Sequence, residues 1–233
     1  MDQLDGIRAF VSVEYEAWPC AAGAQILRVR SQRDGRLRAV QTAAAGEALA
    51  IRRLTRLPND VFGKRSSYRE TLDIRGEAAN LERLIRLVDG MHDALIDVAH
   101  PDLSTTLFGK DVVFVEPDPN AAIRYQYLMR KNASYDHAAY LKRYREVHSQ
   151  FGLRLEGIKG YVQFHVDPEA SRALSQAAGF GAFGVDSVSE LYLASVESFL
   201  EGVSGSPVGA QAINDEKQFV DRTNSVDFCS RLC

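Results

Sequence analysis

The stretch from Ile123 to Asp221 constrains the fold most, because it has the alternating pattern of a complete small α+β domain. Strand-like runs alternate with helix-like runs, and turn residues separate them. The expected order is strand, helix, strand, helix, strand, helix and a short terminal helix, over residues 123–130, 134–151, 160–166, 168–176, 189–193, 195–201 and 215–222. Polar side chains recur on these segments where a pocket would open between helix and sheet.

The N-terminal half has a similar content. Five strands are predicted, over residues 7–15, 25–30, 49–54, 68–74 and 105–115, together with an amphipathic helix over residues 78–99. Two prolines in Glu116-Pro-Asp-Pro-Asn120 separate the halves. A long amphipathic helix must be buried on a sheet. We therefore predict an α+β fold with two domains, 1–116 and 121–233, packed sheet to sheet around one core.

Composition excludes several classes of partner. The 233 residues are 45% hydrophobic and 25% charged, which is typical of a compact water-soluble protein. The net charge is only −3 and the two signs are interspersed, so neither nucleic acid nor an anionic membrane is an expected partner. The acidic start lacks the layout of a signal peptide, and no apolar run is long enough to span a bilayer. A cytoplasmic location is the expectation.

Three cysteines, Cys20, Cys229 and Cys233, are too few and too scattered to predict a disulfide scaffold or a zinc site. The two near the C-terminus are expected in a frayed tail. Metal-binding patterns such as HExxH are also missing, so no metal is predicted.

One strand carries an unusual polar face. Alternation places Tyr161, Gln163 and His165 on the same side of the strand at 160–166. Buried polar groups need hydrogen-bond partners, so this face is either exposed to solvent or forms the floor of a polar pocket. We favour the pocket, because the strand lies in the middle of the domain.

The preceding helix supplies a second set of polar groups. Tyr140, Tyr144 and His148 follow one another at helical spacing on an otherwise apolar stripe. Histidine is the usual general acid or base near neutral pH, although a satisfied core histidine is an equally good interpretation. Asp186 follows a glycine-rich loop and is either a turn residue or the carboxylate that orients a histidine. Asp215 is predicted to be a structural helix N-cap.

Taken together, these segments resemble the EthD family, within the dimeric α/β-barrel (ferredoxin-like) superfamily. The resemblance covers residues 123–221 and rests on several motifs. These are Leu128-Met-Arg130-Lys, the Tyr140…Tyr144…His148 pattern, Tyr161-Val-Gln-Phe-His165, Phe183-Gly-Val-Asp186 with Glu190-Leu-Tyr192, and Asp215-Glu…Phe219-Val-Asp221. Tyr144 stands where the family usually has tryptophan, and Ser187 where glycine usually follows the aspartate.

The resemblance implies two ferredoxin-like halves forming an α/β barrel, with residues 1–116 as a degenerate unit and 121–233 as the EthD-like unit. It also implies enzymes of mixed chemistry, including decarboxylases of aromatic acids, cyclases, cofactor-free monooxygenases and accessory proteins. Haem enzymes occur in the wider superfamily, for which His148 or His92 is the candidate axial ligand. A homodimer is left open.

We expect a cofactor-independent lyase, a decarboxylase of a phenolic or conjugated aromatic carboxylic acid. The predicted catalytic residues are His148, His165, Tyr144 and Asp186, with His148 or His165 moving the proton and a tyrosine binding the oxyanion. The predicted substrate-binding residues are Tyr127, Arg130, Tyr140, Tyr161 and Gln163. Two alternatives remain: a cofactor-free monooxygenase of a hydroxylated aromatic, which forms a substrate anion in the same pocket, and a non-catalytic small-molecule binding protein.

Overall fold

The computed structural model describes residues 6–13, 49–62, 68–77, 85–89, 104–181 and 184–232. Contacts divide the chain into two compact units, each made of several segments. The first unit comprises residues 1–53, 67–109 and 169–183, and the second comprises 54–66, 110–168 and 184–233. Because neither unit is one continuous stretch, the predicted domains 1–116 and 121–233 remain a prediction.

In the first unit, β1 (Gly6–Val13) pairs antiparallel with β3 (Glu70–Glu77). This unit also contains the beginnings of β2 (Ala50–Arg56) and β4 (Thr105–Val115), and nearly all of α5 (Pro168–Ala177). These elements confirm four of the predicted strands and the second helix. Residues 85–89 are helical, as predicted. The remaining predicted strand, at 25–30, lies outside the described residues.

Two serines attach α5 to β4 within the first unit. The Ser171 hydroxyl accepts from the backbone N–H of Phe108 at 2.9 Å, and Ser175 accepts from that of Thr106 at 3.2 Å. Both hydroxyls also donate to the carbonyl oxygens of the same two residues. Each buried serine is therefore satisfied and fixes the helix on the strand.

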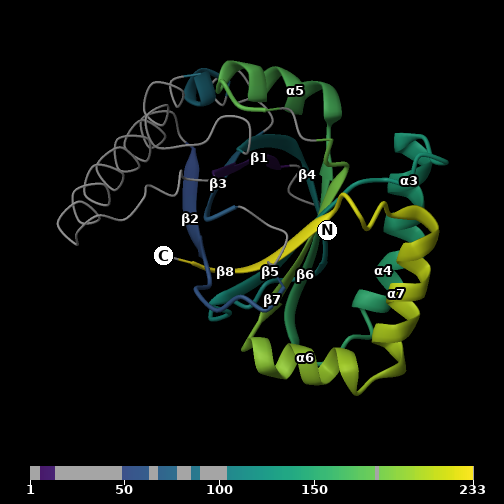
Figure 1. Ribbon diagram of the computed structural model, residues 1–233. Helices are drawn as coiled ribbons and strands as arrows, with labels where there is room; N and C mark the ends of the chain where they lie inside the picture. The colour runs from purple at the N-terminus through teal and green to yellow at the C-terminus, as the bar shows by residue number, and fades with distance from the viewer. Residues whose placement is uncertain are drawn as a thin grey trace, which may run out of the picture. The chain divides into compact units, whose positions relative to one another are not determined.

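The second unit contains an antiparallel sheet whose strands lie in the order β2, β8, β5, β7, β6, β4. Its central strands are β5 (Ile123–Met129), β6 (Ile158–Val166), β7 (Ser187–Leu193) and β8 (Val226–Leu232). In the register, Tyr125 of β5 lies opposite Leu191 of β7 and Cys229 of β8. Figure 1 shows the course of these strands. Because β5 pairs on both sides, its side chains occupy the centre of this sheet.

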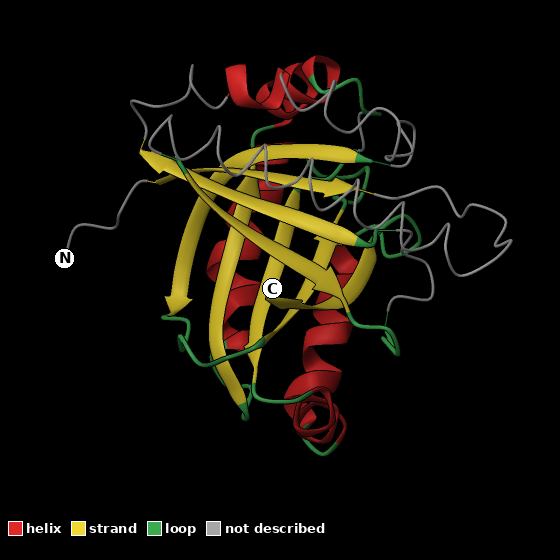
Figure 2. Cartoon of the chain, turned by 90° about the vertical axis from the view of Figure 1, so that its left-hand side faces the viewer, coloured by secondary structure: helices red, strands yellow, loops and turns green. Residues whose placement is uncertain are grey.

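Helices cover one face of the sheet in the second unit. These helices are α3 (His137–Arg143), η4 (Tyr144–His148), α4 (Ser149–Gly152), α6 (Val196–Ser204) and α7 (Pro207–Phe219). Figure 2 shows them behind the strands of the sheet. An α+β structure is thus present, as the sequence predicted. Among the described helices, none is long and apolar enough to cross a membrane.

The predicted helix at 134–151 exists, but it contains a π-helical turn. Its N-cap is Asp136, which accepts from the backbone N–H of Ala139, rather than Ser134. The π-helical segment η4 changes which carbonyls are bonded, and the Ser149 hydroxyl donates to the carbonyl oxygen of Arg145 at 2.6 Å. Such widened turns are frequent at functional sites. Here the turn ends at His148.

The C-terminal segment differs from its prediction. The sequence predicts helices at 195–201 and 215–222, but α6 continues to Ser204 and α7 starts at Pro207. Ser206 is the N-cap, and it accepts from the N–H of Val208 at 3.2 Å. Asp215 is therefore a buried residue within α7, and its assignment as an N-cap is wrong.

The expected frayed tail is also wrong for the described residues. Residues 226–232 form β8, which pairs with both β5 and β2. Cys229 lies on this strand, is buried, and has a thiol whose pKa burial raises to about 12. A thiol with such a pKa stays protonated and unreactive at neutral pH. Cys20 and Cys233 lie outside the described residues.

Candidate active site

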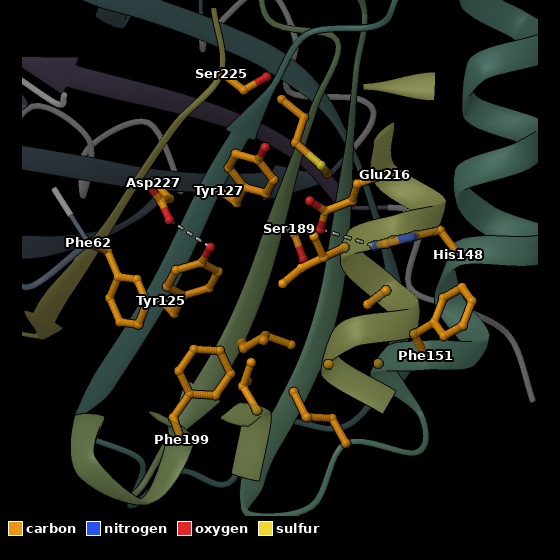
Figure 3. A pocket seen from close by; sticks show the side chains of 18 of the residues that line it. Phe62, Tyr125, Tyr127, His148, Phe151, Ser189, Phe199, Glu216, Ser225 and Asp227 are labelled. Carbon is orange, nitrogen blue, oxygen red and sulfur yellow. Dashed lines mark hydrogen bonds and ion pairs between the residues drawn. The ribbon is translucent and has the colours of Figure 1, made fainter. Parts of the chain in front are cut away.

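A cavity of about 630 Å³ lies between the sheet and the helices of the second unit. All of its lining residues belong to this unit. The sheet contributes side chains from β5, β6, β7 and β8, and the opposite wall comes from η4, α4, α6 and α7 (Figure 3). A volume of this size suits a small organic ligand.

His148 lines the cavity and forms a pair with Asp215, which lies behind the wall. Nδ1 of His148 lies 3.0 Å from Oδ2 of Asp215. The other carboxylate oxygen of Asp215 accepts from the Arg143 guanidinium. A carboxylate only accepts hydrogen bonds, so Nδ1 carries the proton. In neutral His148, Nε2 therefore holds the lone pair, and the imidazole is directed toward Glu216 in the cavity wall (Figure 3).

Burial lowers the pKa of His148, which is 8% exposed, below its usual value. The hydrogen bond and charge of Asp215 oppose this effect, while the positive charge of Arg143 adds to it. Rings pack around the imidazole, with centroids at 5.3 Å for Phe219, 5.7 Å for Phe151 and 5.8 Å for Tyr144. The contacts fix the orientation of the His148 ring, and the lowered pKa favours its neutral form. The neutral imidazole is the form that accepts a proton.

Glu216 places a carboxylate next to this histidine. Its Oε1 lies 3.8 Å from Nε2 of His148, and its Oε2 lies 3.6 Å from Nε of Arg222. Burial raises the pKa of Glu216 to about 7, against a lowering by Arg222. A carboxyl group with this pKa exchanges protons near neutrality, which makes it a second candidate acid or base.

A phenol and another carboxylate stand at the β5–β8 side of the cavity. The Tyr125 hydroxyl donates to Oδ2 of Asp227 at 3.0 Å. Burial raises the pKa of Asp227 above its usual range, although the hydrogen bond from Tyr125 partly offsets this shift. Figure 3 shows Asp227 and Glu216 on opposite sides of the space between sheet and helix. Acidic side chains therefore border the cavity on two sides.

The other end of the cavity is aromatic and aliphatic. The rings of Phe62, Tyr125 and Phe199 cluster there, with centroid separations of 5.0 to 5.9 Å. Asp60 holds the segment before Phe62, because its carboxylate accepts from the Phe62 N–H at 3.1 Å and from Arg56 at 3.0 Å. This end is suited to an apolar ring system.

Three of the residues predicted from the sequence line the cavity: His148, Tyr127 and Tyr161. Burial raises the pKa of both tyrosines above their usual value, so they are neutral hydrogen-bonding groups at physiological pH. Tyr161 also stacks on Phe114, with ring centroids 5.2 Å apart. The predicted pocket face of β6 therefore contributes one residue to the cavity wall.

Tyr140 and Tyr144 do not line the cavity. Both are fully buried in the layer behind it and stack on each other with centroids 6.1 Å apart. The Tyr140 hydroxyl is bound to that of Ser187 at 2.7 Å. Burial raises the pKa of Tyr144 well above its usual value, and Ser189 opposes this only in part. These residues support His148 and do not reach a ligand.

Gln163 and His165 form a chain that ends at Tyr161. The Gln163 amide donates to the Tyr161 hydroxyl at 2.7 Å and to the Tyr144 carbonyl oxygen at 3.0 Å. Nε2 of His165 lies 3.0 Å from Oε1 of Gln163. Burial, with nearby Arg145 and His137, lowers the pKa of His165 to about 4. Because neither residue lines the cavity, they position Tyr161.

Asp186 and Arg130 also lie away from the cavity. The Asp186 carboxylate accepts from the Lys131 N–H at 2.8 Å and pairs with Nδ1 of His137 at 2.9 Å. Nε2 of His137 in turn lies 2.9 Å from the Val166 carbonyl oxygen. Asp186 therefore orients a histidine, which is one of its two predicted roles. This histidine is His137, which does not line the cavity. The Arg130 N–H donates to Ser225.

Several lining residues were not predicted from the sequence. They are Phe62, Tyr125, Ser189, Glu216, Arg222 and Asp227. Asp215 was named but assigned a structural role. Asp215 and Glu216 lie inside α7, which begins at Pro207, rather than at the start of a helix. The Ser206-Pro207 pair, a good N-cap followed by proline at the first helical position, was the available signal.

Replacement of Gly152 by alanine is expected to disturb this site directly. A Cβ at Gly152 would lie 2.5 Å from Cε1 of Tyr161, so the ring must move. Overpacking of this kind costs about 1–3 kcal/mol of unfolding free energy, measurable by chemical denaturation, and should weaken ligand binding as well. Gly184→Ala is the matched control, since nothing lies within 4 Å of its added Cβ. Equal stability of both variants would contradict the packing described.

The lining does not fit a haem group. Nε2 of His148, the atom that would bind iron, faces the Glu216 carboxylate at 3.8 Å. Among the described residues that line the cavity, Arg222 is the only arginine or lysine, and it meets Glu216 and Asp227. Two propionates would add negative charge to this wall. His92 lies outside the described residues. Within the described part of the chain, no cluster of three His, Cys, Asp or Glu can hold a metal ion.

Comparisons with known proteins bear on the family and on the fold. Residues 132–223 match the model of the EthD domain, so the resemblance to this family is confirmed over these residues. This match spans His148, Asp215, Glu216 and Arg222. A search of curated proteins finds no match.

Solved structures align over nearly the whole chain. An anthrone oxidase-like protein has a TM-score of 0.62 at 7% identity, with 100% of this chain and 92% of that chain covered. A Fusobacterium nucleatum protein provisionally assigned as a monooxygenase has a TM-score of 0.54 at 7% identity, covering 98% and 92%. A variant of the chlorite dismutase from Candidatus Nitrospira defluvii has a TM-score of 0.55 at 9% identity, covering 100% and 93%. These likenesses confirm the predicted α+β fold class.

The expected lyase activity is contradicted by the same comparisons. The neighbours are named as monooxygenase, oxidase-like protein and chlorite dismutase, which are oxidoreductase names. Arg130, predicted to bind the substrate, does not line the cavity. The decarboxylase is therefore not retained.

Proposed function

We propose that the protein is a cofactor-independent monooxygenase that acts on a hydroxylated aromatic compound bound in the cavity of the second unit. The observation that carries this proposal is the His148–Asp215 pair, with Nδ1 bonded at 3.0 Å and the imidazole lining a cavity of about 630 Å³. The oxidoreductase names of the structural neighbours support it. The EthD domain over residues 132–223 is compatible with it.

The first step is removal of the phenolic proton of the substrate. Nε2 of His148 accepts it, and Asp215 stabilises the imidazolium that forms. The hydroxyl groups of Tyr127 and Tyr161 keep their own protons because burial raises their pKa. They are therefore able to donate hydrogen bonds to the phenolate oxygen, which stabilises the charge that develops there.

The second step is oxidation of the phenolate by molecular oxygen. An electron-rich phenolate transfers an electron to O2, and the two radicals combine at the ring carbon para to the phenolate oxygen. The imidazolium of His148 returns its proton to the peroxide that forms, and loss of water, which also takes the hydrogen of that ring carbon, then gives a quinone. One oxygen atom of O2 enters the product and the other leaves as water, so the phenol supplies all of the electrons. The apolar end formed by Phe62, Tyr125 and Phe199 holds the rest of the ring system.

The test is oxygen uptake by the purified protein with a panel of mono- and dihydroxylated naphthalenes and anthracenes. In an ¹⁸O2 atmosphere, we expect one labelled oxygen in the quinone product. Incorporation from H2¹⁸O instead, after control for exchange of the quinone carbonyl oxygen, would contradict a monooxygenase. Tight binding of a phenol without oxygen uptake would favour the non-catalytic small-molecule binding protein.

The proposed location is the cytoplasm, where a phenol-oxidising enzyme of this kind would meet its substrates.

A homodimer is the second expectation, and in it the two copies would contact each other through the same face. Size-exclusion chromatography with light scattering measures the mass in solution, and a value near 25.8 kDa would identify a monomer.

A further inference from the structure

The distribution of charge around the cavity restricts the ligands it accepts. Glu216 and Asp227 both line the cavity, on α7 and β8 respectively. The Glu216 side chain is only 14% exposed, so water screens its charge poorly. Within the described lining, Arg222 is the only arginine or lysine, and its side chain is 42% exposed. The buried part of the wall is therefore acidic.

The Glu216 carboxylate acts on the whole polar wall. Its negative charge raises the pKa of five tyrosines, Tyr125, Tyr127, Tyr140, Tyr144 and Tyr161. Three of these, Tyr125, Tyr127 and Tyr161, line the cavity. A ligand that touches these phenols therefore experiences the same field. The field favours a hydroxyl group, which donates a hydrogen bond, and opposes a fixed negative charge.

We infer that the site takes uncharged hydroxylated aromatics and rejects their carboxylated counterparts, with Glu216 as the specificity-determining residue. The inference rests on the proposed function for the identity of the site. A ligand hydroxyl placed near Nε2 of His148 also lies close to the Glu216 carboxylate, because these atoms are 3.8 Å apart. A ligand carboxylate in the same place would be a second anion beside Glu216, which is unfavourable in a poorly hydrated cavity. A phenolate formed there differs, because the proton that it loses stays on His148 and balances its charge.

The experiment is anaerobic binding of three fluorescent probes: 1-naphthol, 1-hydroxy-2-naphthoic acid and the methyl ester of that acid. The ester has the size of the acid without its charge. At pH 8 we expect the wild-type protein to bind naphthol and the ester at least about tenfold more tightly than the acid. In Glu216→Gln the gap between ester and acid should shrink by about tenfold. Glu201→Gln, an exposed change on α6, is the matched control and should leave it unchanged.

The acidity of the wall adds a pH signature. The groups facing Glu216 are His148, Arg222, Asp227 and Tyr127, with Asp215 on its own helix. The pKa of Glu216 is raised to about 7, so its charge is largely lost at pH 6, while the probe acid stays ionised. Discrimination against the acid should therefore fall between pH 8 and pH 6 in the wild type and change little in Glu216→Gln.

The outcomes separate this inference from the proposed function. Equal binding of acid and ester by the wild type, or an unchanged gap in both Glu216→Gln and Asp227→Asn, would overturn the inference even if oxygen uptake is observed. A smaller gap only in Asp227→Asn would overturn the role of Glu216. The predicted selectivity without any oxygen uptake would support the inference and contradict the monooxygenase. Failure of all three probes to bind would overturn both.

Discussion

Replacement of His148 by glutamine is expected to lower kcat for oxygen uptake by about 10²–10⁴, because the variant lacks the group that removes the phenolic proton. Glutamine keeps a hydrogen-bonding side chain of similar length, so the cavity should persist. The Kd of the phenol, measured anaerobically by fluorescence, is expected to change by less than about tenfold, since the base acts mainly on the chemical step.

His165→Gln is the matched control for this change. Its imidazole does not line the cavity, and its pKa is lowered to about 4, so it is a poor base at neutral pH. We expect oxygen uptake within about threefold of the wild type, because only a hydrogen bond to Gln163 is altered. If His165→Gln abolished turnover while His148→Gln did not, the assignment of the base would be wrong.

Asp215→Asn is expected to give the second large effect, a fall in kcat of about 10²–10³. The amide in place of the carboxylate no longer fixes the proton on Nδ1 of His148, so Nε2 loses its defined role as acceptor. Asp215 also raises the pKa of His148 through its hydrogen bond and charge. The base must be neutral to act, so the acidic limb of the pH profile of kcat/KM should move to lower pH in this variant.

Arg143→Gln separates this effect from general disruption. Arg143 binds the same carboxylate, but its positive charge lowers the pKa of His148. Its removal should move the acidic limb to higher pH, opposite to the shift in Asp215→Asn. Shifts in the same direction for both variants would show that Asp215 acts on stability rather than on the imidazole.

The fold was predictable where hydrophobic period and turn residues agree. The helix at 137–152 and the strands β4 to β7 were identified because their apolar residues recur with a clear period. By contrast, β8 mixes polar with apolar residues and is fixed by its pairing with β5 and β2. Local sequence does not reveal such long-range pairing.

The site was predictable only in part. The spacing of Tyr140, Tyr144 and His148 correctly placed three rings on one helix face, and His148 reached the cavity. The partners of His148 were missed because Asp215 and Glu216 were assigned to the start of a helix that begins eight residues earlier, at Pro207. Phe62 was missed because it comes from a loop of the N-terminal half. Tertiary contacts, rather than local pattern, bring these groups together.

The most direct test of the central claim is the absorption spectrum of a bound phenol in the absence of oxygen. If His148, held by Asp215, takes the phenolic proton, 1,8-dihydroxynaphthalene mixed anaerobically with the wild-type protein at pH 7 should show the red-shifted band of its phenolate. That band should be missing in His148→Gln and should decay when oxygen is admitted. Oxygen uptake by a substrate that remains a neutral phenol in the wild-type protein, with no such band, would contradict the account.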